Sequence, residues 1–390
     1  MIPAPGSDQE KKILILTSDT GLGHRSASNA VAEALSECYG PACRTIILNP
    51  ILDRPAPYFL RKSMKDYDQT VRQHPAAFRF SYEAMNVPAL RPLLERILNL
   101  LLVNSMAAIL QEVRPDAVLS TYHIFNAPMG AALAACRLSI PFHTAITDLA
   151  KVHTCWLNPT PAKFYLPTAE VRAEALAAGI PAGKIVVSGI PVNPQIGCET
   201  RQKSELRLVL GWEPGLATLL VVGSRRVKRL PEHLEALDRC ASPFQIVFVA
   251  GGDGPAYRQA RAMSWRHPVR LYDFVDDLPI MLHAADLLVC KAGGLMVAEG
   301  LACGLPILLI DAIEGQETGN VAYVSSHQAG CLVRSPEALL ALLDGWPGKG
   351  AHQLDQFAKN ARQLGRPEAA YQVARSLWQS VQERDTEKTP

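Results

Sequence analysis

The chain has 390 residues, of which 48% are hydrophobic and 19% are charged, and its formal net charge is +2. This length predicts two domains with full-sized cores, and the composition excludes a disordered or fibrous protein. The small net charge provides no general attraction to nucleic acid, so no nucleic-acid partner is expected.

The cysteines and the amino terminus indicate the compartment. Nine cysteines are scattered along the chain without a C-x-x-C pair or the spacing of a structural zinc site. This favours a reducing cytoplasm over a disulfide framework. The first ten residues contain no apolar signal segment, and the apolar run at 97–103 is too short to span a bilayer. We therefore expect any membrane association to be peripheral.

In the first half of the chain, apolar runs alternate with helical patterns, as is typical of a parallel α/β sheet. Residues 57–103 combine aromatic side chains with a basic stretch, in which 61–79 carries five Lys or Arg against two Asp, a net +3. This pattern suits either an anionic membrane surface or amphipathic helices packed on the domain.

The apolar runs of the first half predict six strands. They are expected at 13–17, 45–48, 117–121, 143–147, 164–167 and 185–188.

The second half repeats this rhythm. Glycine, proline and asparagine crowd together at 189–199, the expected linker. A helical pattern at 351–382 could return to the first domain. Strands are predicted at 217–223, 244–250, 269–274, 287–290 and 307–310.

The predicted fold class is therefore α/β, with two Rossmann-like domains whose parallel sheets face each other across a cleft. The expected bounds are 1–195 for the first domain and 196–350 for the second. A C-terminal helical segment at 351–390 is expected to cross back to the first domain.

The first predicted strand ends in the sequence TSDTGLGHR at 17–25. Two glycines before a helix make a tight turn at which the backbone can approach a ligand. The third glycine of the dinucleotide fingerprint is missing, and Asn49 and Pro50 replace the acid expected after the second strand, so dinucleotide binding is disfavoured. His24 would lie above the strand ends, where an imidazole can accept a proton near neutral pH. A capping or packing role is the alternative.

In the second half, the most informative stretch is 291–320. Gly293 and Gly294 follow a buried strand and open a helix whose free N–H groups favour an anion. Glu299 lies within the first two turns of that helix and could reach a pair of sugar hydroxyls, which we favour over a solvated surface acid. Gln316, after the next strand, is suited to binding hydroxyl groups. This layout is typical of a nucleotide-sugar site at the carboxyl ends of parallel strands.

Weaker patterns surround this stretch. The glycine turn at 251–254 is common, and the backbone at 274–279 could pair with the edge of a base. Arg225 follows the strand at 217–223 and would either offset a diphosphate or belong to a solvated loop. The D-x-D triplet at 66–68 lies in a basic, helix-like stretch, so no metal site is predicted. Helix N-termini and cationic side chains would then stabilise a leaving diphosphate.

Together, the segments 17–35, 146–159 and 291–320 resemble the diacylglycerol glycosyltransferases, that is, the monogalactosyl- and glucosyl-diacylglycerol synthases. A more distant likeness is to the peptidoglycan lipid-linked N-acetylglucosaminyltransferase. The sequences that carry the resemblance are TSDTGLGHRSASNAVAEAL, ITDLAKVHTCWLNP and KAGGLMVAEGLACGLPILL with EGQETGN. The resemblance implies a GT-B fold, a UDP-sugar donor in the C-terminal domain, and inversion at the anomeric carbon without a metal or other cofactor.

The resemblance also implies residue roles, in which Glu299 holds the ribose and His24 acts as base or positions the acceptor. Val275 would lie beside the uracil. Catalytic roles fall to His24, Asp148 and His123. The acceptor side would comprise Gly23, Arg25, His153 and Trp156. The donor would be bound by Gly223, Arg225, Gly252, Val275, Gly293, Gly294, Leu295, Glu299, Gln316 and Glu317.

Three positions depart from the family pattern. Leu22 stands in a turn where the family often has a further glycine, and Ile124 replaces the proline that usually follows His123. The loop at 224–229 is basic and free of glycine, which weakens the expected diphosphate contacts there. The segment 57–103 resembles the membrane-facing region of the family.

The predicted function is transfer of a hexose from a UDP-sugar to a lipid acceptor such as diacylglycerol. The partners would be the UDP-sugar, the lipid and an anionic membrane surface, with the protein peripheral on the cytoplasmic face of the membrane. Two alternatives use the same scaffold: a UDP-sugar 2-epimerase, and a non-catalytic protein that binds a nucleotide sugar. The aromatic and basic stretch disfavours the epimerase, which has no need of a lipid.

Overall fold

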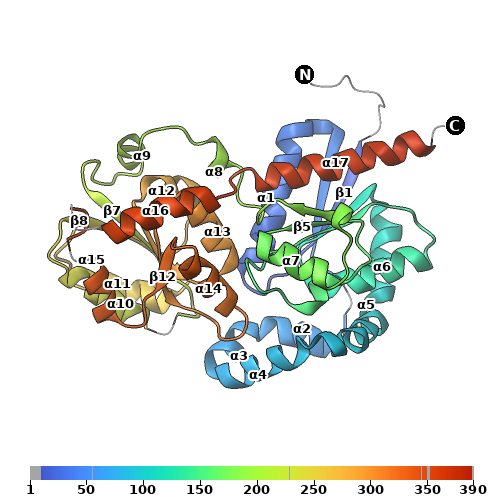
Figure 1. The fold of residues 1–390 in the computed structure, drawn as a ribbon, viewed down its shortest axis with the longest axis horizontal. Coiled ribbons are helices and arrows are strands. Elements are labelled where there is room, and N and C mark those ends of the chain that lie inside the picture. Colours follow the sequence, from blue (N-terminus) through green and yellow to red (C-terminus); the bar gives the residue numbers. More distant parts are fainter. Residues whose placement is uncertain (1–9, 55, 228, 344, 349–351, 389–390) are drawn as a thin grey trace. The chain divides into compact units, whose positions relative to one another are not determined.

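The computed structural model describes residues 10–54, 56–227, 229–343, 345–348 and 352–388 (Figure 1). The chain divides into two compact units, each built on its own sheet. Unit 1 comprises Met1–Tyr67, Ser81–Pro194 and Glu368–Pro390, and unit 2 comprises Asp68–Phe80 and Gln195–Pro367.

Unit 1 contains a six-stranded sheet of order β2-β1-β3-β4-β5-β6, in which every pair of neighbours is parallel. The six strands predicted for the first half are confirmed, each within a few residues. They are β1 (Lys11–Leu16), β2 (Cys43–Leu48), β3 (Ala117–Ser120), β4 (Phe142–Ala145), β5 (Lys163–Leu166) and β6 (Ile185–Val187).

Both faces of this sheet are covered because successive side chains of a strand point to opposite faces. Ile13 and Ile15 of β1 pack in one core cluster with apolar side chains of α1 (Leu22–Tyr39) and α17 (Ala369–Lys388). Leu14 and Leu16 pack in another cluster with side chains of α5 (Arg91–Val113) and α6 (Asn126–Ala135). A parallel sheet buried on both faces reads as a continuous apolar run, which is why the sequence pattern found it.

The remaining helical segments of unit 1 lie between these elements. They are η1 (Gly40–Ala42), α2 (Tyr58–Lys65), η2 (Pro88–Leu90), η3 (His123–Phe125), η4 (Thr154–Leu157), α7 (Ala169–Ala177) and η5 (Ala182–Lys184). Helices α3 (Tyr67–Gln73) and α4 (Pro75–Met85) are divided between the units, since 68–80 belongs to unit 2.

Unit 2 contains a second parallel six-stranded sheet, of order β12-β11-β10-β7-β8-β9. The five predicted strands are β7 (Ala217–Val222), β8 (Phe244–Val249), β9 (Val269–Tyr272), β10 (Leu287–Lys291) and β11 (Ile307–Asp311). The sequence pattern missed β12 (Gly330–Leu332), which at three residues is too short to show alternation.

Helices of unit 2 alternate with the strands. They are α8 (Gln195–Cys198), α9 (Lys203–Val209), α10 (Leu230–Arg239), α11 (Gly254–Ala262), α12 (Leu278–Ala284), α13 (Gly294–Ala302), α14 (Thr318–Ser326), α15 (Pro336–Leu343) and α16 (His352–Leu364). Two parallel α/β sheets of this kind confirm the predicted fold class.

The C-terminal segment forms two helices instead of one. Helix α16 belongs to unit 2, whereas α17 belongs to unit 1 and lies along α1 (Figure 1). The chain between them carries Gly365 and Pro367, and proline cannot continue a helix because its ring clashes with the preceding turn. A Cβ atom at Gly365 would lie 2.4 Å from the carbonyl oxygen of Leu301, so the close packing of this connection requires glycine.

The apolar helix near 97–103 is longer than the sequence pattern indicated. In a continuous helical stretch, Pro88–Val113, a window of 18 residues has a mean hydropathy of 1.6, so this helix is long and apolar enough to cross a membrane. Its second half nevertheless belongs to the core of unit 1, where Leu102, Met106 and Ile109 are fully buried. We therefore interpret α5 as a core helix whose first half exposes an apolar face.

Candidate active site

His24 lies where three neighbouring strands of unit 1 end. It is the third residue of α1, which follows β1, and it is 9% exposed. Its Nδ1 atom lies 3.0 Å from the carbonyl oxygen of Thr121, after β3, and 2.7 Å from Oγ1 of Thr147, after β4. Between β1 and β3 the strand order reverses, which is the usual place of a ligand site in such sheets. The imidazole thus occupies the expected position, and its catalytic role stays a prediction.

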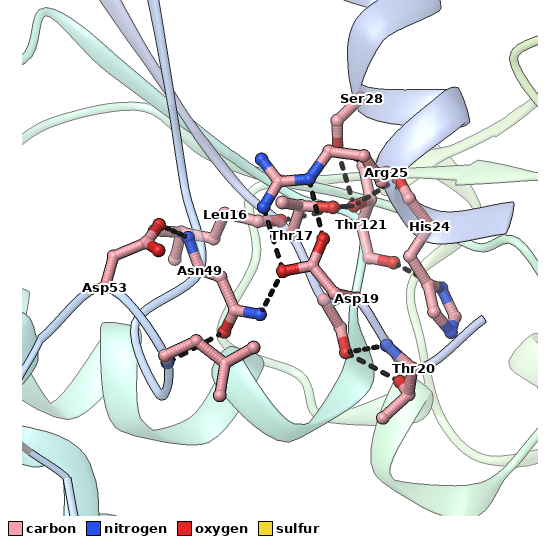
Figure 2. A network of polar contacts seen from close by, with 12 residues as sticks. Leu16, Thr17, Asp19, Thr20, His24, Arg25, Ser28, Asn49, Asp53 and Thr121 are labelled. Atoms are coloured by element: carbon pink, nitrogen blue, oxygen red, sulfur yellow. Dashed lines mark hydrogen bonds and ion pairs between the residues drawn. The ribbon is translucent and has the colours of Figure 1, made fainter. Parts of the chain in front are cut away.

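A network of polar contacts holds the turn that precedes His24 (Figure 2). Arg25 donates hydrogen bonds of 2.8 and 3.1 Å to the two carboxylate oxygens of Asp19, and Asn49 donates one of 2.8 Å to the same carboxylate. The bond from Arg25 outweighs the effect of burial and lowers the pKa of Asp19. Arg25, which the resemblance assigned to the acceptor side, is engaged within the turn itself. The residue with positive φ (76°) is Gly21, whereas Gly23 lies inside α1.

A chain of aromatic rings connects His24 with the other histidines predicted for this site. The ring centroids of His24 and Tyr122 are 4.8 Å apart, and those of Tyr122 and His123 are also 4.8 Å apart. His123 in turn lies 4.7 Å from the ring of His153 and 5.5 Å from that of Trp156. The structure therefore brings together residues that are up to 132 positions apart in the sequence.

Residues 147–156, the segment that contains Asp148, His153 and Trp156, fold back on themselves beside these rings. The indole Nε1 of Trp156 donates to Oδ2 of Asp148 at 2.7 Å. The backbone N–H of Cys155 donates to Nδ1 of His153 at 3.2 Å, so His153 caps η4. Because Nδ1 accepts this bond, the proton of the neutral His153 ring is on Nε2. His153 thus both caps η4 and lies in the site.

His123 and His153 are uncharged at neutral pH. Burial lowers the pKa of His123 well below its ordinary value, and the neighbouring His153 and His24 lower it further. Burial alone lowers the pKa of His153 to about 4. The Nδ1 atom of His123 is buried and has no hydrogen-bond partner among the residues that the structure describes. A buried polar atom left in this state costs free energy, which is typical of a ligand site.

In unit 2, the strand order reverses between β7 and β10, and the glycine pair follows β10. Gly293 is the N-cap of α13, and a Cβ atom there would lie 2.9 Å from Nζ of Lys291. Lys291 forms an ion pair with Glu317, whose other carboxylate oxygen accepts a 2.8 Å hydrogen bond from the backbone N–H of Ile313. Glu317, assigned to the donor sugar, is therefore already held by two partners beside the helix terminus.

Glu299 is a buried acid of α13 with an exposed fraction of 8%. No residue in the described part of the chain donates a hydrogen bond to its carboxyl group, and burial raises its pKa to about 8. The side chain is therefore mostly protonated at pH 7. An isolated buried carboxyl group is costly in a protein that uses it only for folding, so it marks a candidate ligand contact.

The loops after β7 and β8 touch each other. Arg225 donates a 2.8 Å hydrogen bond to the carbonyl oxygen of Gly252. Gly251 has a φ of 63°, and a Cβ atom there would lie 2.7 Å from the carbonyl oxygen of Gly223, so this contact requires glycine. Arg226 is paired with Asp68, at 2.9 Å between Nε and Oδ1. The guanidinium groups of this basic loop are thus partly engaged with protein.

The other residues assigned to the donor lie at the same edge of the sheet of unit 2. Leu295 is in the first turn of α13, Val275 follows β9, and Gln316 follows β11; all three are partly exposed. Since the carboxyl ends of parallel strands share one edge, these positions are consistent with the predicted site. Within the described ranges, no group of three or more His, Cys, Asp or Glu residues could hold a metal ion.

Several residues of the site were missed by the sequence analysis. Thr121 and Thr147 each closed a predicted strand, and a hydroxyl at a strand end is the signal that could have found them. Lys291 also ends a strand. Asp19 stands in the quoted turn, but its pairing with Arg25 depends on the turn's conformation.

Comparison with known proteins agrees with this architecture. Residues 24–192 match the family model of monogalactosyldiacylglycerol (MGDG) synthase, and residues 217–344 match that of glycosyl transferases group 1. The probable MGDG synthase of Glycine max is 28% identical over 387 residues, which cover 97% of this chain and 73% of that protein.

Two solved structures share the fold. MurG of Acinetobacter baumannii has a TM-score of 0.61 at 19% identity, covering 95% of this chain and 99% of that one. The UDP-GlcNAc 2-epimerase of Neisseria meningitidis bound to UDP-GlcNAc has a TM-score of 0.56 at 14% identity, covering 94% and 100%. The architecture is therefore that of the GT-B glycosyltransferases. Within this class, the chain is similar to the MGDG synthases over 97% of its length, and its residues 24–192 match their family model.

Proposed function

We propose that this protein transfers a hexose from a UDP-sugar to the hydroxyl group of a lipid acceptor such as diacylglycerol, with inversion at the anomeric carbon and without a metal ion. The observation that carries the proposal is the position of the three motifs shared with the family. In each unit, they gather at the carboxyl ends of the strands, where the strand order reverses.

Unit 2 would bind the donor. The N-terminus of α13 offers backbone N–H groups to the diphosphate, and Gly293 lets the ligand approach them. Glu299 would accept hydrogen bonds from the two ribose hydroxyls, which requires its carboxylate form. Gln316 and Glu317 would contact the sugar, and the backbone near Val275 would contact the uracil.

In the reaction, His24 would remove the proton from the acceptor hydroxyl as the acceptor oxygen forms its bond to the anomeric carbon. The bond between that carbon and the diphosphate oxygen breaks, and UDP leaves with the electron pair. The helix terminus of α13 would stabilise the negative charge that develops on the diphosphate. Asp148 and His123 would support the acceptor side.

The charges near His24 favour a neutral acceptor. His123 and His153 are uncharged at pH 7. Arg25 is bound to Asp19. A lipid with a plain hydroxyl headgroup fits these surroundings better than one with a phosphate, because an anion would find little compensating charge there.

Unit 1 would also bind an anionic membrane surface, on the cytoplasmic face of the membrane. Leu93, Ile97 and Leu100 lie on one face of α5, at spacings of four and three residues, and are 59%, 45% and 76% exposed. Helix α2 adds the exposed Tyr58 and Phe59 together with Arg61, Lys62 and Lys65. Apolar side chains beside Lys and Arg suit an interface with anionic lipid headgroups.

Replacing two of these side chains tests the membrane contact. The double variant Leu93→Glu, Leu100→Glu should bind vesicles of anionic phospholipid about tenfold more weakly or worse, because each leucine contributes about 1.5 kcal/mol or more when buried in lipid. Co-sedimentation measures the bound fraction. Leu208→Glu, on the 64% exposed leucine of α9, is the matched control and should bind like the parent protein. Equal loss in both variants would contradict the assignment.

A screen of UDP-sugars against vesicles that contain diacylglycerol tests the function itself. Release of UDP together with a glycosylated lipid is the expected result. Conversion of a UDP-sugar to its epimer without any lipid would support the epimerase instead. Tight UDP binding without product on a broad panel of lipids would indicate a protein that only senses the nucleotide sugar.

A further inference from the structure

We infer that Thr147 is a positioning residue for His24. Its hydroxyl and the backbone carbonyl of Thr121 both accept a hydrogen bond from the Nδ1–H group of the imidazole. The proton is thereby held on Nδ1, and Nε2 is the basic nitrogen. The catalytic effect of Thr147 rests on the proposed function. The position of the proton on the His24 ring depends only on contacts within unit 1, and the experiments below test the two separately.

The contacts of Nδ1 determine which nitrogen carries the proton. A carbonyl oxygen can only accept a hydrogen bond, so the 3.0 Å contact with the oxygen of Thr121 places the proton on Nδ1. Oγ1 of Thr147, at 2.7 Å, then acts as a second acceptor of the same proton. In the neutral ring, the unprotonated lone pair is therefore on Nε2, the nitrogen that can act as a base.

The surrounding hydrogen bonds fix the backbone on both sides of this contact. Oγ of Ser28 donates to the carbonyl oxygen of His24 at 3.0 Å and lies 2.8 Å from Oγ1 of Thr121. Oγ1 of Thr121 also lies 3.2 Å from the carbonyl oxygen of Leu16, the last residue of β1. Thr121, Ser28 and Leu16 are fully buried, and Thr147 is 6% exposed. The start of α1 is thus tied to the ends of β1 and β3, while Thr147 reaches the ring from the end of β4.

This arrangement matters most when the ring gains a second proton. Once Nε2 has taken the proton of the acceptor hydroxyl, the imidazolium donates from Nδ1 to two oxygens that are already in place. A preorganised acceptor stabilises the developing charge without reorganisation at the moment of reaction. Hydrogen bonds to charged groups contribute about 1.5–3 kcal/mol, which corresponds to roughly tenfold to a hundredfold in rate.

The tautomer is measured first, on the full-length protein without substrate. Nitrogen-15 NMR of histidine-labelled protein at pH 8.5 distinguishes a protonated from an unprotonated ring nitrogen. The signals of His24 are assigned as those missing from the His24→Asn variant. We expect a proton on Nδ1 and none on Nε2. A proton on Nε2 would overturn the inference whether or not the protein has transferase activity.

The contribution of Thr147 is measured by two substitutions. Thr147→Val removes the hydroxyl and keeps the shape, whereas Thr147→Ser keeps the hydroxyl. We expect Thr147→Val to lower kcat roughly tenfold to a hundredfold with an unchanged KM for the UDP-sugar, and Thr147→Ser to stay within about threefold of the parent.

Unchanged kcat in the valine variant, or an equal loss in both variants, would overturn the role of the Thr147 hydroxyl. UDP binding and far-ultraviolet circular dichroism show whether each variant is folded. If the valine variant misfolds, the activity of the serine variant and the tautomer of His24 measured by NMR decide whether the inference holds. If the parent protein transfers no hexose to any acceptor, the proposed function fails, and the tautomer still decides the geometric part.

Discussion

Replacing His24 with asparagine should lower the rate of hexose transfer by about two to four orders of magnitude, the range that a positioned general base contributes. Asparagine can still donate a hydrogen bond to the carbonyl oxygen of Thr121, so the turn should keep its conformation, but its amide cannot accept a proton. The initial rate of UDP release with saturating donor and acceptor measures the effect. UDP binding should remain unchanged, since the proposed donor site lies in unit 2.

The matched control for this prediction is His352→Asn, on an exposed histidine of α16. It should transfer hexose at the parent rate. Transfer by the His24→Asn variant at a rate close to that of the parent would show that another group removes the proton. His123 would then be the next candidate, because it lies in the same chain of rings and is uncharged at neutral pH.

Replacing Glu299 with alanine should weaken the binding of a UDP-hexose by about a hundredfold or more. The carboxylate would accept two hydrogen bonds from the ribose, and charge-assisted bonds contribute about 1.5–3 kcal/mol each. Isothermal titration calorimetry measures the affinity. Glu235→Ala, on an exposed residue of α10, is the control and should bind as the parent does. Equal affinity in Glu299→Ala and the parent would remove this residue from the donor site.

The same site predicts a dependence on pH with a definite sign. Burial raises the pKa of Glu299 to about 8, so the carboxyl group of the free protein is protonated at pH 7. If the ribose binds the carboxylate, binding must release this proton, and close to one proton per ligand should appear at pH 7. The affinity for a UDP-hexose should therefore rise as the pH increases from 6 to 8 and level off above the pKa of the free carboxyl group.

Titrations in buffers with different ionisation enthalpies count the released protons. The Glu299→Gln variant, which cannot titrate, should release none and should show a flat affinity over this range. Proton uptake on binding, or an affinity that falls between pH 6 and 8, would contradict the proposed contact with the carboxylate.

The fold and part of the site were predictable because their signals are local. Of the twelve strands in the described part of the chain, eleven were predicted from short apolar runs, since a strand of a parallel sheet is buried on both faces. The positions of His24 and Gly293 followed from their place directly after such runs. Each of these inferences depends only on the residues of one strand and of the turn that follows it in the sequence.

The contacts that give these residues their chemical state depended on tertiary structure. Thr121 and Thr147 are 97 and 123 residues from His24 in the sequence, and they meet it only because β3 lies beside β1 in the sheet and β4 lies beside β3. The burial that raises the pKa of Glu299 likewise arises from packing around α13.

The sequence by itself therefore determined most of the strands, the glycine turns and the family motifs, because a buried apolar run and the conformation of a turn are properties of neighbouring residues. The tertiary structure alone decided which partners hold Arg25, Lys291 and Glu317, and that the C-terminal segment divides into α16 and α17. The physical reason is that strand order and side-chain pairing join residues far apart in the chain, and no local pattern encodes which of several suitable partners will be adjacent.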